Sequence, residues 1–547
     1  MKVLGSLRAA LASLTLALAA CAGVPGPEDE PFVATDGELT SATGVERAVQ
    51  FASYVYVDPG ASDEVIGATI ARQVKTALGA LRASQIGLRD RAASNARVPS
   101  KWTRETVTVG DPSAPSAGGA GARTLLRVRY TYDDRAIVAR RYDRLSSAPL
   151  TLLFGDYAAK SELVRGACSD DKTSETDSLW YHFAPELGAC RTLQTKEATA
   201  LVTERKALGS DPSRVGPAEV ARTFMPLTMK LAPAVAGSTT ASPEYDRLFG
   251  LDSGRDTIRV YAFFGVDADE NDPNDALGRE AVGFLRGLLR AMPNLRVVQT
   301  QPFAMLLDLS VDGRRIEGVT YEQLTAWVLG EAAYPAAVGA DPARILAFRK
   351  QCLAKLTERA IDLAVPLTIQ RGATTVTRRL EVRFFYGYED GSFEARQKAT
   401  WRYLEAFWHG DVFLYNGHSH FGHGPLEPTA YTGANFNDRY QLMLVNSCLS
   451  YNYYHDDFFA LKPGGTKNLD KIVNGLPSSV RGSGAVTAAL LAGLFDGKQS
   501  TYATLLGAMQ RAAPTQMEAL RLVDGELDNA FSQGKTPLTV SVGSPVY

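Results

Sequence analysis

The second half of the chain alternates short apolar runs with longer segments of helical periodicity, and this alternation limits the fold more than any other feature. Residues 257–266 (TIRVYAFFGV) have the composition of a buried strand, and residues 276–292 (ALGREAVGFLRGLLRAM) have helical periodicity. Further helices are expected at 343–361 and 394–408, followed by the apolar strands DVFLYN and YQLMLVN. Such alternation predicts an α/β region with a mostly parallel sheet and helices on both faces, in which ligands bind at the carboxyl ends of the strands.

The first half has a different pattern. Strand-like runs at 48–57, 103–109, 124–134 and 149–155 are interrupted by one helical run at 63–83. With 547 residues the chain is too long for one hydrophobic core. We therefore expect an α+β domain over residues 45–240, whose role the sequence does not indicate, followed by the α/β domain over residues 250–530.

The amino terminus carries an export pattern. Lys2 and Arg8 lead into an apolar run at residues 9–20, which is shorter than the roughly 20 residues that span a bilayer. The run ends in Leu-Ala-Ala-Cys21, which resembles the lipobox of bacterial lipoproteins. The resemblance implies that residues 1–21 hold a signal peptide and that Cys21 is lipidated. It also implies a lipid-anchored protein of the bacterial cell envelope, with Ala22 favouring the outer membrane. The alternative is an ordinary cleaved signal peptide.

Composition narrows the classes of partner. Residues 22–44 are rich in Pro, Gly and acidic residues, which is typical of a flexible tether. The chain has 58 basic and 60 acidic residues and no basic block, so nothing in it favours nucleic-acid binding. The expected partners are a peptide or protein substrate and a membrane reached through the lipid, and no cofactor is expected.

Four cysteines remain when Cys21 carries a lipid. Cys168 and Cys190 flank the polar loop SDDKTSETDS and the aromatic cluster LWYHF, which favours a local disulfide in an exported protein. Cys352 lies within a run of helical periodicity, so it is expected to be a buried structural thiol. Cys448 is therefore expected to be a free thiol.

The chemistry-bearing residues gather late in the chain. Five of the six histidines lie between residues 409 and 455. His418 comes just after the strand DVFLYN, and Cys448 comes just after the strand YQLMLVN. Two neighbouring parallel strands would place this imidazole and this thiol at the same edge of the sheet. The arrangement predicts a Cys/His dyad.

These segments, YNGHSHFGHG and LMLVNSCLS, resemble the caspase-hemoglobinase fold of clan CD cysteine peptidases. They are most similar to gingipain-like and clostripain-like enzymes, and the resemblance covers residues 375–515. It implies that Cys448 is the nucleophile and His418 the general acid/base. It also implies that the backbone N–H groups of Ser419 and Cys448 stabilise the oxyanion.

The chain departs from this family at one position. The clan usually has glycine directly after the catalytic histidine, where this chain has Ser419. His423, followed by Gly424, matches that local pattern better but lies farther from the strand end. His418 is the preferred candidate because of its place at the strand end, and His423 is its rival.

Other polar residues near the dyad carry weaker expectations. Asn416 or Asn446 is expected to orient the imidazole. Asp456 and Asp457 are expected to line a pocket for a basic side chain. By analogy with the family, Ser483 and Gly484 are expected to approach the substrate. The segment DKIVNGL is expected to end a helix, and residues 485–494 suit a buried strand or helix. The acidic run that begins at Asp267 lacks the diagnostic positions of a calcium loop and is expected to be solvated.

Two other function classes remain open. His418, His420 and His423 resemble the HxHxDH zinc motif of metallo-β-lactamase-fold hydrolases, although Gly422 stands where that motif has Asp. This resemblance implies a zinc-dependent hydrolase. The second class is a non-catalytic surface binding or scaffold lipoprotein with a degenerate peptidase fold, and it is favoured over the zinc-dependent hydrolase.

Overall fold

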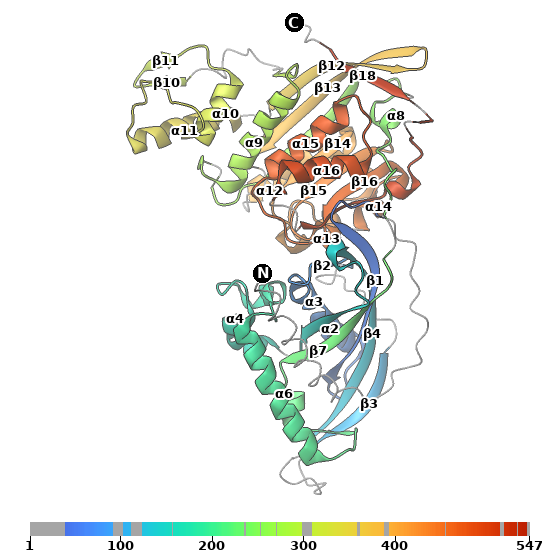
Figure 1. The fold of residues 1–547 in the computed structure, drawn as a ribbon. Helices are drawn as coiled ribbons and strands as arrows, with labels where there is room; N and C mark the ends of the chain where they lie inside the picture. The colour runs from blue at the N-terminus through green and yellow to red at the C-terminus, as the bar shows by residue number, and fades with distance from the viewer. Residues whose placement is uncertain are drawn as a thin grey trace, which may run out of the picture.

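Two sheets organise the chain, one in each half, and they form two stacked lobes in this computed structural model (Figure 1). The structure describes residues 39–90, 102–110, 123–155, 157–234, 237–251, 253–269, 271–297, 309–357, 361–387, 393–454, 456–514, 519–532, 534–535 and 537–543. The expected lipidation site Cys21 and the expected tether up to residue 38 lie outside the described residues. None of the described helices has the length and apolarity to cross a bilayer.

The amino-terminal lobe is built on a mostly antiparallel sheet with the strand order β5-β7-β1-β4-β3-β6, and β2 pairs with β4 at one end. Its strands are β1 (Gly44–Val57), β2 (Ile86–Leu88), β3 (Trp102–Val109), β4 (Arg123–Ala139), β5 (Ser147–Leu153), β6 (Arg214–Val215) and β7 (Phe224–Leu231). Its main helices are α2 (Asp63–Lys75), α3 (Ala77–Ala80), α4 (Ser161–Cys168), α5 (Leu179–His182) and α6 (Gly188–Leu208). Helix and strand are mixed, and β1 pairs with β4 along its whole length.

The carboxyl-terminal lobe is built on the sheet β17-β16-β15-β14-β8-β13-β12-β18, with β9 paired to β12. Its strands are β8 (Thr257–Phe264), β9 (Arg296–Val297), β12 (Ile361–Arg371), β13 (Thr374–Tyr386), β14 (Val412–Asn416), β15 (Gln441–Asn446), β16 (Leu469–Asn474), β17 (Arg521–Asp524) and β18 (Leu538–Val542). The five strands from β13 to β16 in this order are mutually parallel. Numbered along the chain they run 2-1-3-4-5, a doubly wound order whose switch point lies between β8 and β14.

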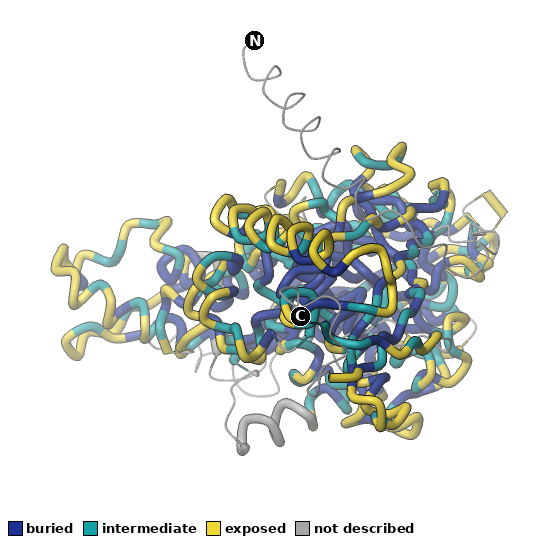
Figure 2. The backbone as a smooth tube through the Cα atoms, turned by 90° about the horizontal axis from the view of Figure 1, so that it is seen from below, coloured by how far each residue is buried: buried dark blue, intermediate teal, exposed yellow. Residues whose placement is uncertain are grey.

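Helices cover both faces of this sheet. One face packs against α9 (Ala276–Ala291), α15 (Ser483–Phe495) and α16 (Tyr502–Ala512), and the other packs against α12 (Phe393–His409) and the amino-terminal lobe. Phe413 and Tyr415 of β14 face α12, whereas Val412 and Leu414 face the opposite layer. Figure 2 shows the buried backbone concentrated in the middle of the molecule, with exposed segments around it. The expected mixed α/β fold with a mostly parallel sheet is confirmed.

One element was predicted wrongly. DKIVNGL was expected to end a helix, but it forms the buried parallel strand β16. The charges of Asp470 and Lys471 hid the strand, because side chains of this type are rarely buried, and here both are fully buried. Tyr440 donates a hydrogen bond of 2.6 Å to the Asp470 carboxylate, and Lys471 donates one of 2.7 Å to the carbonyl of Tyr454. Burial raises the pKa of Asp470 to about 7 and lowers that of Lys471 to about 8.

Two other segments take a definite form. Residues 485–494, for which strand and helix were both open, lie within α15. The helix expected at 343–361 is α11 (Pro342–Thr357), and Ile361 instead begins β12, which pairs with β13 in a hairpin. The hairpin was not expected from the sequence.

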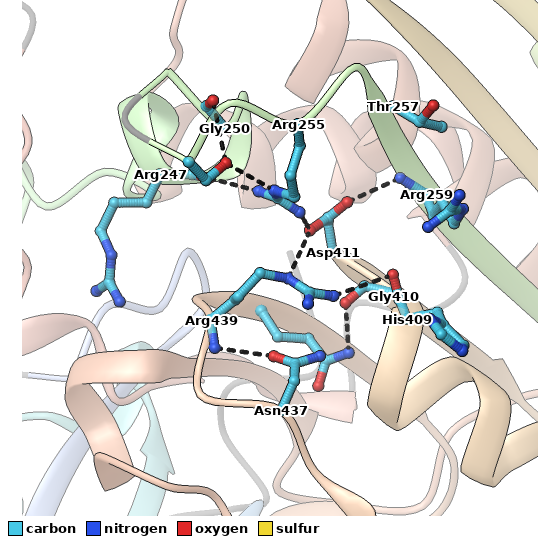
Figure 3. Close-up of polar contacts among 12 residues, drawn as sticks. Arg247, Gly250, Arg255, Thr257, Arg259, His409, Gly410, Asp411, Asn437 and Arg439 are labelled. Carbon is cyan, nitrogen blue, oxygen red and sulfur yellow. Dashed lines mark hydrogen bonds and ion pairs between the residues drawn. The ribbon is translucent and has the colours of Figure 1, made fainter.

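The amino-terminal end of β14 is fixed by a buried carboxylate (Figure 3). Asp411 accepts a hydrogen bond from the guanidinium of Arg255 and one of 2.8 Å from the backbone N–H of Arg259, and Arg439 lies 4.0 Å away. Burial raises the pKa of Asp411, although the charge of Arg255 acts in the opposite direction. These contacts tie β14 to its neighbour β8 at the edge opposite the expected site.

The two lobes touch through their backbones. Gly87 of β2 lies so close to Gly475, the residue after β16, that an added Cβ would be 1.9 Å from the Gly475 carbonyl oxygen. The Tyr451 hydroxyl donates a hydrogen bond of 2.6 Å to Glu46 of β1, and the Asn452 amide donates one of 3.2 Å to the carbonyl of Leu88. One hydrophobic cluster runs through both lobes. The amino-terminal lobe is thus packed against the sheet rather than tethered beside it.

We expect Gly87→Ala to lower the free energy of unfolding by about 1–3 kcal/mol, because the new methyl group has no room between the lobes. Gly60→Ala is the matched control, since no atom lies within 4 Å of its added Cβ. That variant should stay within about 0.5 kcal/mol of the parent. Urea unfolding followed by fluorescence measures both. Equal stability of the two variants would contradict this backbone contact.

Candidate active site

His418 and Cys448 follow neighbouring parallel strands in matched positions. Asn416 at the end of β14 is in register with Asn446 at the end of β15, and each candidate residue comes two positions later. Neighbouring strands are about 4.8 Å apart, so the two segments leave the sheet side by side at its carboxyl edge. The adjacent gap between β8 and β14 is the topological switch point, where doubly wound sheets bind their ligands.

The imidazole of His418 is paired with a carboxylate. Its Nε2 lies 3.3 Å from Oδ1 of Asp267, and the two side chains are 41% and 40% exposed. The His418 carbonyl accepts a hydrogen bond of 2.7 Å from the Tyr415 hydroxyl. A carboxylate in this place orients the ring.

The loop that carries Asp267 is held in place from within. The buried carboxylate of Asp275 accepts hydrogen bonds of 3.0, 2.7 and 3.3 Å from the backbone N–H groups of Asp267, Ala268 and Asp269. It also caps α9 by accepting from Gly278 at 2.8 Å. The loop was expected only to be solvated, and Asp267 is indeed partly exposed, but it also meets the imidazole. Its position three residues beyond the apolar strand β8 was the signal that could have identified it.

Cys448 lies in a sharp turn between strand and helix. The thiol is partly buried and is 3.6 Å from the Ser478 carbonyl, to which it donates a hydrogen bond. Leu449 has a φ of 50°, and α13 (Ser450–Tyr453) begins at the next residue. A left-handed leucine costs about 1–3 kcal/mol and persists only where its surroundings impose it. In the His418 loop, His420 and Phe421 also have positive φ, of 45° and 55°.

A row of polar side chains joins the strand ends behind the site. The Asn446 amide donates 2.9 Å to the Asn416 oxygen, and the Asn474 amide donates 3.0 Å to the Asn446 oxygen. Arg521 of β17 donates to the same Asn446 oxygen at 3.0 Å. Burial lowers the pKa of Arg521 to about 10. These asparagines were proposed to orient the imidazole; their side chains link the strand ends to one another, and Asp267 provides the carboxylate partner of His418.

The proposed oxyanion donors are the backbone N–H groups of two residues that follow neighbouring strands. Ser419 is buried, and its carbonyl accepts a hydrogen bond of 3.1 Å from the Tyr454 hydroxyl. Within the described part of the chain, neither the Ser419 nor the Cys448 backbone N–H donates to a protein acceptor.

The remaining candidates lie around this edge. His423 is 56% exposed, and its Nδ1 is 3.4 Å from Glu427 Oε1. Ser483 begins α15, and the Gly484 N–H donates 2.9 Å to Glu280. Asp456 pairs with Arg89 of the amino-terminal lobe at 3.1 Å, and Asp457 is the first residue of α14 (Asp457–Leu461). His455 lies outside the described residues.

The structure gives no donor set for zinc among the residues it describes. Over those residues, no three or more His, Cys, Asp or Glu side chains are grouped to hold a metal ion. The rings of His418 and His420 are near each other, with centroids 5.7 Å apart, whereas His423 pairs with Glu427.

The cysteines separate into distinct states. Cys168 and Cys190 form the disulfide expected from the sequence, with an S–S distance of 2.01 Å. Cys352 is a free thiol fully buried in α11, and burial raises its pKa to about 12. Cys448 is the more accessible of the two free thiols in the described ranges.

Comparison of the chain with protein-family models, curated proteins and solved structures finds no match. Function is therefore inferred from the residues and their geometry.

We expect Asp267→Asn to slow alkylation of Cys448 by iodoacetamide about two- to fivefold at neutral pH. The neutral amide loses the charged contact that orients the His418 imidazole, and a partly exposed ion pair contributes ~0.3–1 kcal/mol. Asp269→Asn is the matched control from the same loop, since its carboxylate accepts only a local hydrogen bond of 2.8 Å from Asn271. Mass spectrometry of the Cys448 peptide gives both rates. Similar rates for the two variants would argue against coupling of Asp267 to the thiol.

Proposed function

We propose that this chain is a cysteine peptidase of the clan CD type, in which Cys448 and His418 form the catalytic dyad of a caspase-like domain. The proposal includes a lipid on Cys21 that holds the protein at the bacterial cell envelope, with the outer membrane as the favoured location. The observation that carries the peptidase function is the parallel, in-register pairing of β14 with β15, which brings an imidazole and a thiol to one edge of the sheet.

The chemistry follows from the positions of the groups. The Cys448 thiolate attacks the carbonyl carbon of a peptide bond, and the backbone N–H groups of Ser419 and Cys448 receive the developing oxyanion. His418 gives its proton to the leaving amine as the C–N bond breaks. It then accepts a proton from the water that hydrolyses the thioester and releases Cys448. Asp267 holds the imidazole in orientation through both steps.

Two further observations support a dyad rather than an inert scaffold. Core packing does not explain why the Asp267 carboxylate lies next to His418, because both side chains are substantially exposed. The left-handed conformation of Leu449 directly after Cys448 is a strained position of the kind that gathers at functional sites. Both features lie beside the two residues that the peptidase chemistry requires.

His418 is a better general acid/base than its rival. It follows β14 directly and has a carboxylate from the neighbouring strand, whereas His423 pairs with Glu427 of its own loop. The serine after His418 does not weaken the role, because the oxyanion contact uses a backbone N–H rather than a side chain.

An acyloxymethyl ketone should label Cys448, and Cys448→Ala should abolish peptide hydrolysis. His418→Ala should reduce hydrolysis about 10²–10⁴-fold, the usual contribution of a general acid/base. His423→Ala is the matched control and should retain most activity. Cys352 is the internal control for labelling, because it is buried and its pKa is raised to about 12.

The outcomes separate the three function classes. Labelling of Cys352 as fast as Cys448, or hydrolysis that survives Cys448→Ala but is lost with a chelator, would exclude the dyad. The second result would identify a zinc hydrolase. Absence of both labelling and hydrolysis over a broad peptide library would leave the scaffold function.

The lipid is tested separately in a bacterial host. Incorporation of labelled palmitate and partitioning into the detergent phase should both be lost in Cys21→Ala, since a single thioether-linked lipid site would be removed. Cys352→Ala, at a buried thiol, should keep both properties. Palmitate labelling that persists in Cys21→Ala would refute the anchor.

A further inference from the structure

The loop that follows His418 packs against an aromatic segment of the amino-terminal lobe. Trp180 and Tyr181 belong to α5, between the two cysteines of the disulfide. Their ring centroids are 5.5 and 5.2 Å from that of Phe421, in edge-to-face arrangements. Phe421 is three residues beyond His418, so the chain that carries the candidate histidine is in contact with the other lobe.

The backbone of this loop has a conformation that its residues do not favour by themselves. His420 and Phe421 are consecutive residues with positive φ, of 45° and 55°. Residues other than glycine rarely adopt this left-handed conformation. The turn is closed by the N–H of Gly422, which donates 2.8 Å to the Ser419 carbonyl, and by that of His423, which donates 3.0 Å to the His420 carbonyl. Two short-range hydrogen bonds of an exchangeable turn are weak support for two left-handed residues, so packing must add to them.

The carboxyl-terminal lobe holds the beginning of the loop. The His418 carbonyl accepts a hydrogen bond of 2.7 Å from the Tyr415 hydroxyl, and the Ser419 carbonyl accepts one of 3.1 Å from the Tyr454 hydroxyl. These bonds fix the backbone up to Ser419. The left-handed residues come next, and there the ring of Phe421 meets the amino-terminal lobe.

The aromatic segment is firmly seated in its own lobe. Its backbone rests on Gly79 of α3, where an added Cβ would lie 2.5 Å from the Trp180 carbonyl oxygen. The ammonium of Lys75 lies 4.1 Å from the centre of the Trp180 ring, and the guanidinium of Arg82 lies 5.0 Å from that of Tyr181.

A second set of contacts fixes the flanks of this segment. Asp170 forms an ion pair of 2.7 Å with Arg82 and a contact of 3.0 Å with His182 Nδ1. The disulfide between Cys168 and Cys190 closes the segment on both sides. The two rings therefore give Phe421 a fixed surface to pack against.

We propose that Phe421 is a positioning residue for His418, and that α5 of the amino-terminal lobe supplies the surface that holds it. Packing of the Phe421 ring stabilises the left-handed turn, and the turn keeps the imidazole at the sheet edge, 3.3 Å from Asp267. The catalytic consequence rests on the proposed function, but the packing of the loop does not. The candidate site is then complete only when both lobes are in contact.

The first test is the kinetics of peptide hydrolysis by the full chain with its disulfide intact. Phe421→Ala removes the ring but leaves a residue that still disfavours positive φ, so the loop should leave its left-handed conformation. We expect kcat to fall about 10–100-fold, the effect of a small displacement of a catalytic group. KM should change less than about threefold, because His418 acts on the leaving amine rather than holding the peptide.

Three further variants complete this test. Phe421→Tyr keeps the ring and should restore kcat to within about threefold of the parent value. Tyr181→Leu removes one of the two neighbouring rings from the other lobe and should give the same pattern with a smaller fall in kcat. Tyr334→Ala is the matched control, because it removes another partly buried ring, which packs on Phe348 at 6.2 Å in the other core cluster. It should lower stability to urea without lowering kcat.

The second test is hydrogen exchange of the loop amides, followed by mass spectrometry of the peptide that contains residues 417–424. Phe421→Ala and Tyr181→Leu should speed exchange at Gly422 and His423 by about tenfold or more, because the turn that protects these amides opens more often. Tyr334→Ala should leave exchange in this peptide unchanged.

Exchange does not require peptide hydrolysis, so the two proposals can fail independently. Unchanged exchange in Phe421→Ala would overturn the packing role, whether or not the protein cleaves peptides. Faster exchange with an unchanged kcat, or a raised KM alone, would overturn the positioning of His418. Faster exchange in a protein that cleaves no peptide would support the packing role of Phe421 and contradict the peptidase function.

Discussion

The in-register pairing of β14 with β15 is the constraint on which the rest of the site depends. A shift of one residue would turn every side chain of β14 to the other face of the sheet, exchanging the layer under α12 with the layer under α15. It would also separate His418 from Cys448 along the sheet edge. Two polar interactions oppose such a shift. At the start of β14 the Asp411 carboxylate accepts a hydrogen bond from the backbone of Arg259, and at the strand ends Asn446 donates one to Asn416. Burial of apolar side chains alone would stabilise the two strands, but it would fix the position of their ends less precisely.

The residues after Cys448 connect this constraint to the other lobe. Helix α13 follows the left-handed Leu449, and its Tyr451 and Asn452 bond to Glu46 and to the carbonyl of Leu88. The turn that presents the thiol is therefore held from both sides, by the sheet through Ser450 and by the amino-terminal lobe through α13. The amino-terminal domain, whose role the sequence does not indicate, thus supports the candidate site, and the aromatic rings of its disulfide-closed segment pack against Phe421 in the loop after His418.

Much of the fold could be predicted because its signals are local. The apolar runs of β8, β14 and β15 and the periodicity of α9 and α16 are continuous in the sequence, and the doubly wound sheet follows from their alternation. Strand β16 was missed because Asp470 and Lys471 are charged in type, although in the fold both are buried and hydrogen-bonded to residues of other elements. Likewise His418 and Cys448 could be chosen from strand ends, and Asp267 also follows a strand, but its contact with His418 could not be predicted. That contact forms only when segments separated by more than a hundred residues come together.

The proposed envelope peptidase requires Cys448 to be a free thiol. Disulfides form readily in oxidising compartments, so other free thiols of the chain should lie away from it. Cys168 and Cys190 are already joined, and Cys352 is buried in the core cluster on the α9 side of the sheet. Leu449, next to Cys448, belongs to the cluster on the opposite side. Cys352 and the neighbour of Cys448 thus belong to core clusters on opposite faces of the sheet, and a lipid on Cys21 would remove the remaining cysteine from exchange. The parallel sheet that carries His418 and Cys448 at one edge therefore also holds Cys352 buried in a separate core layer.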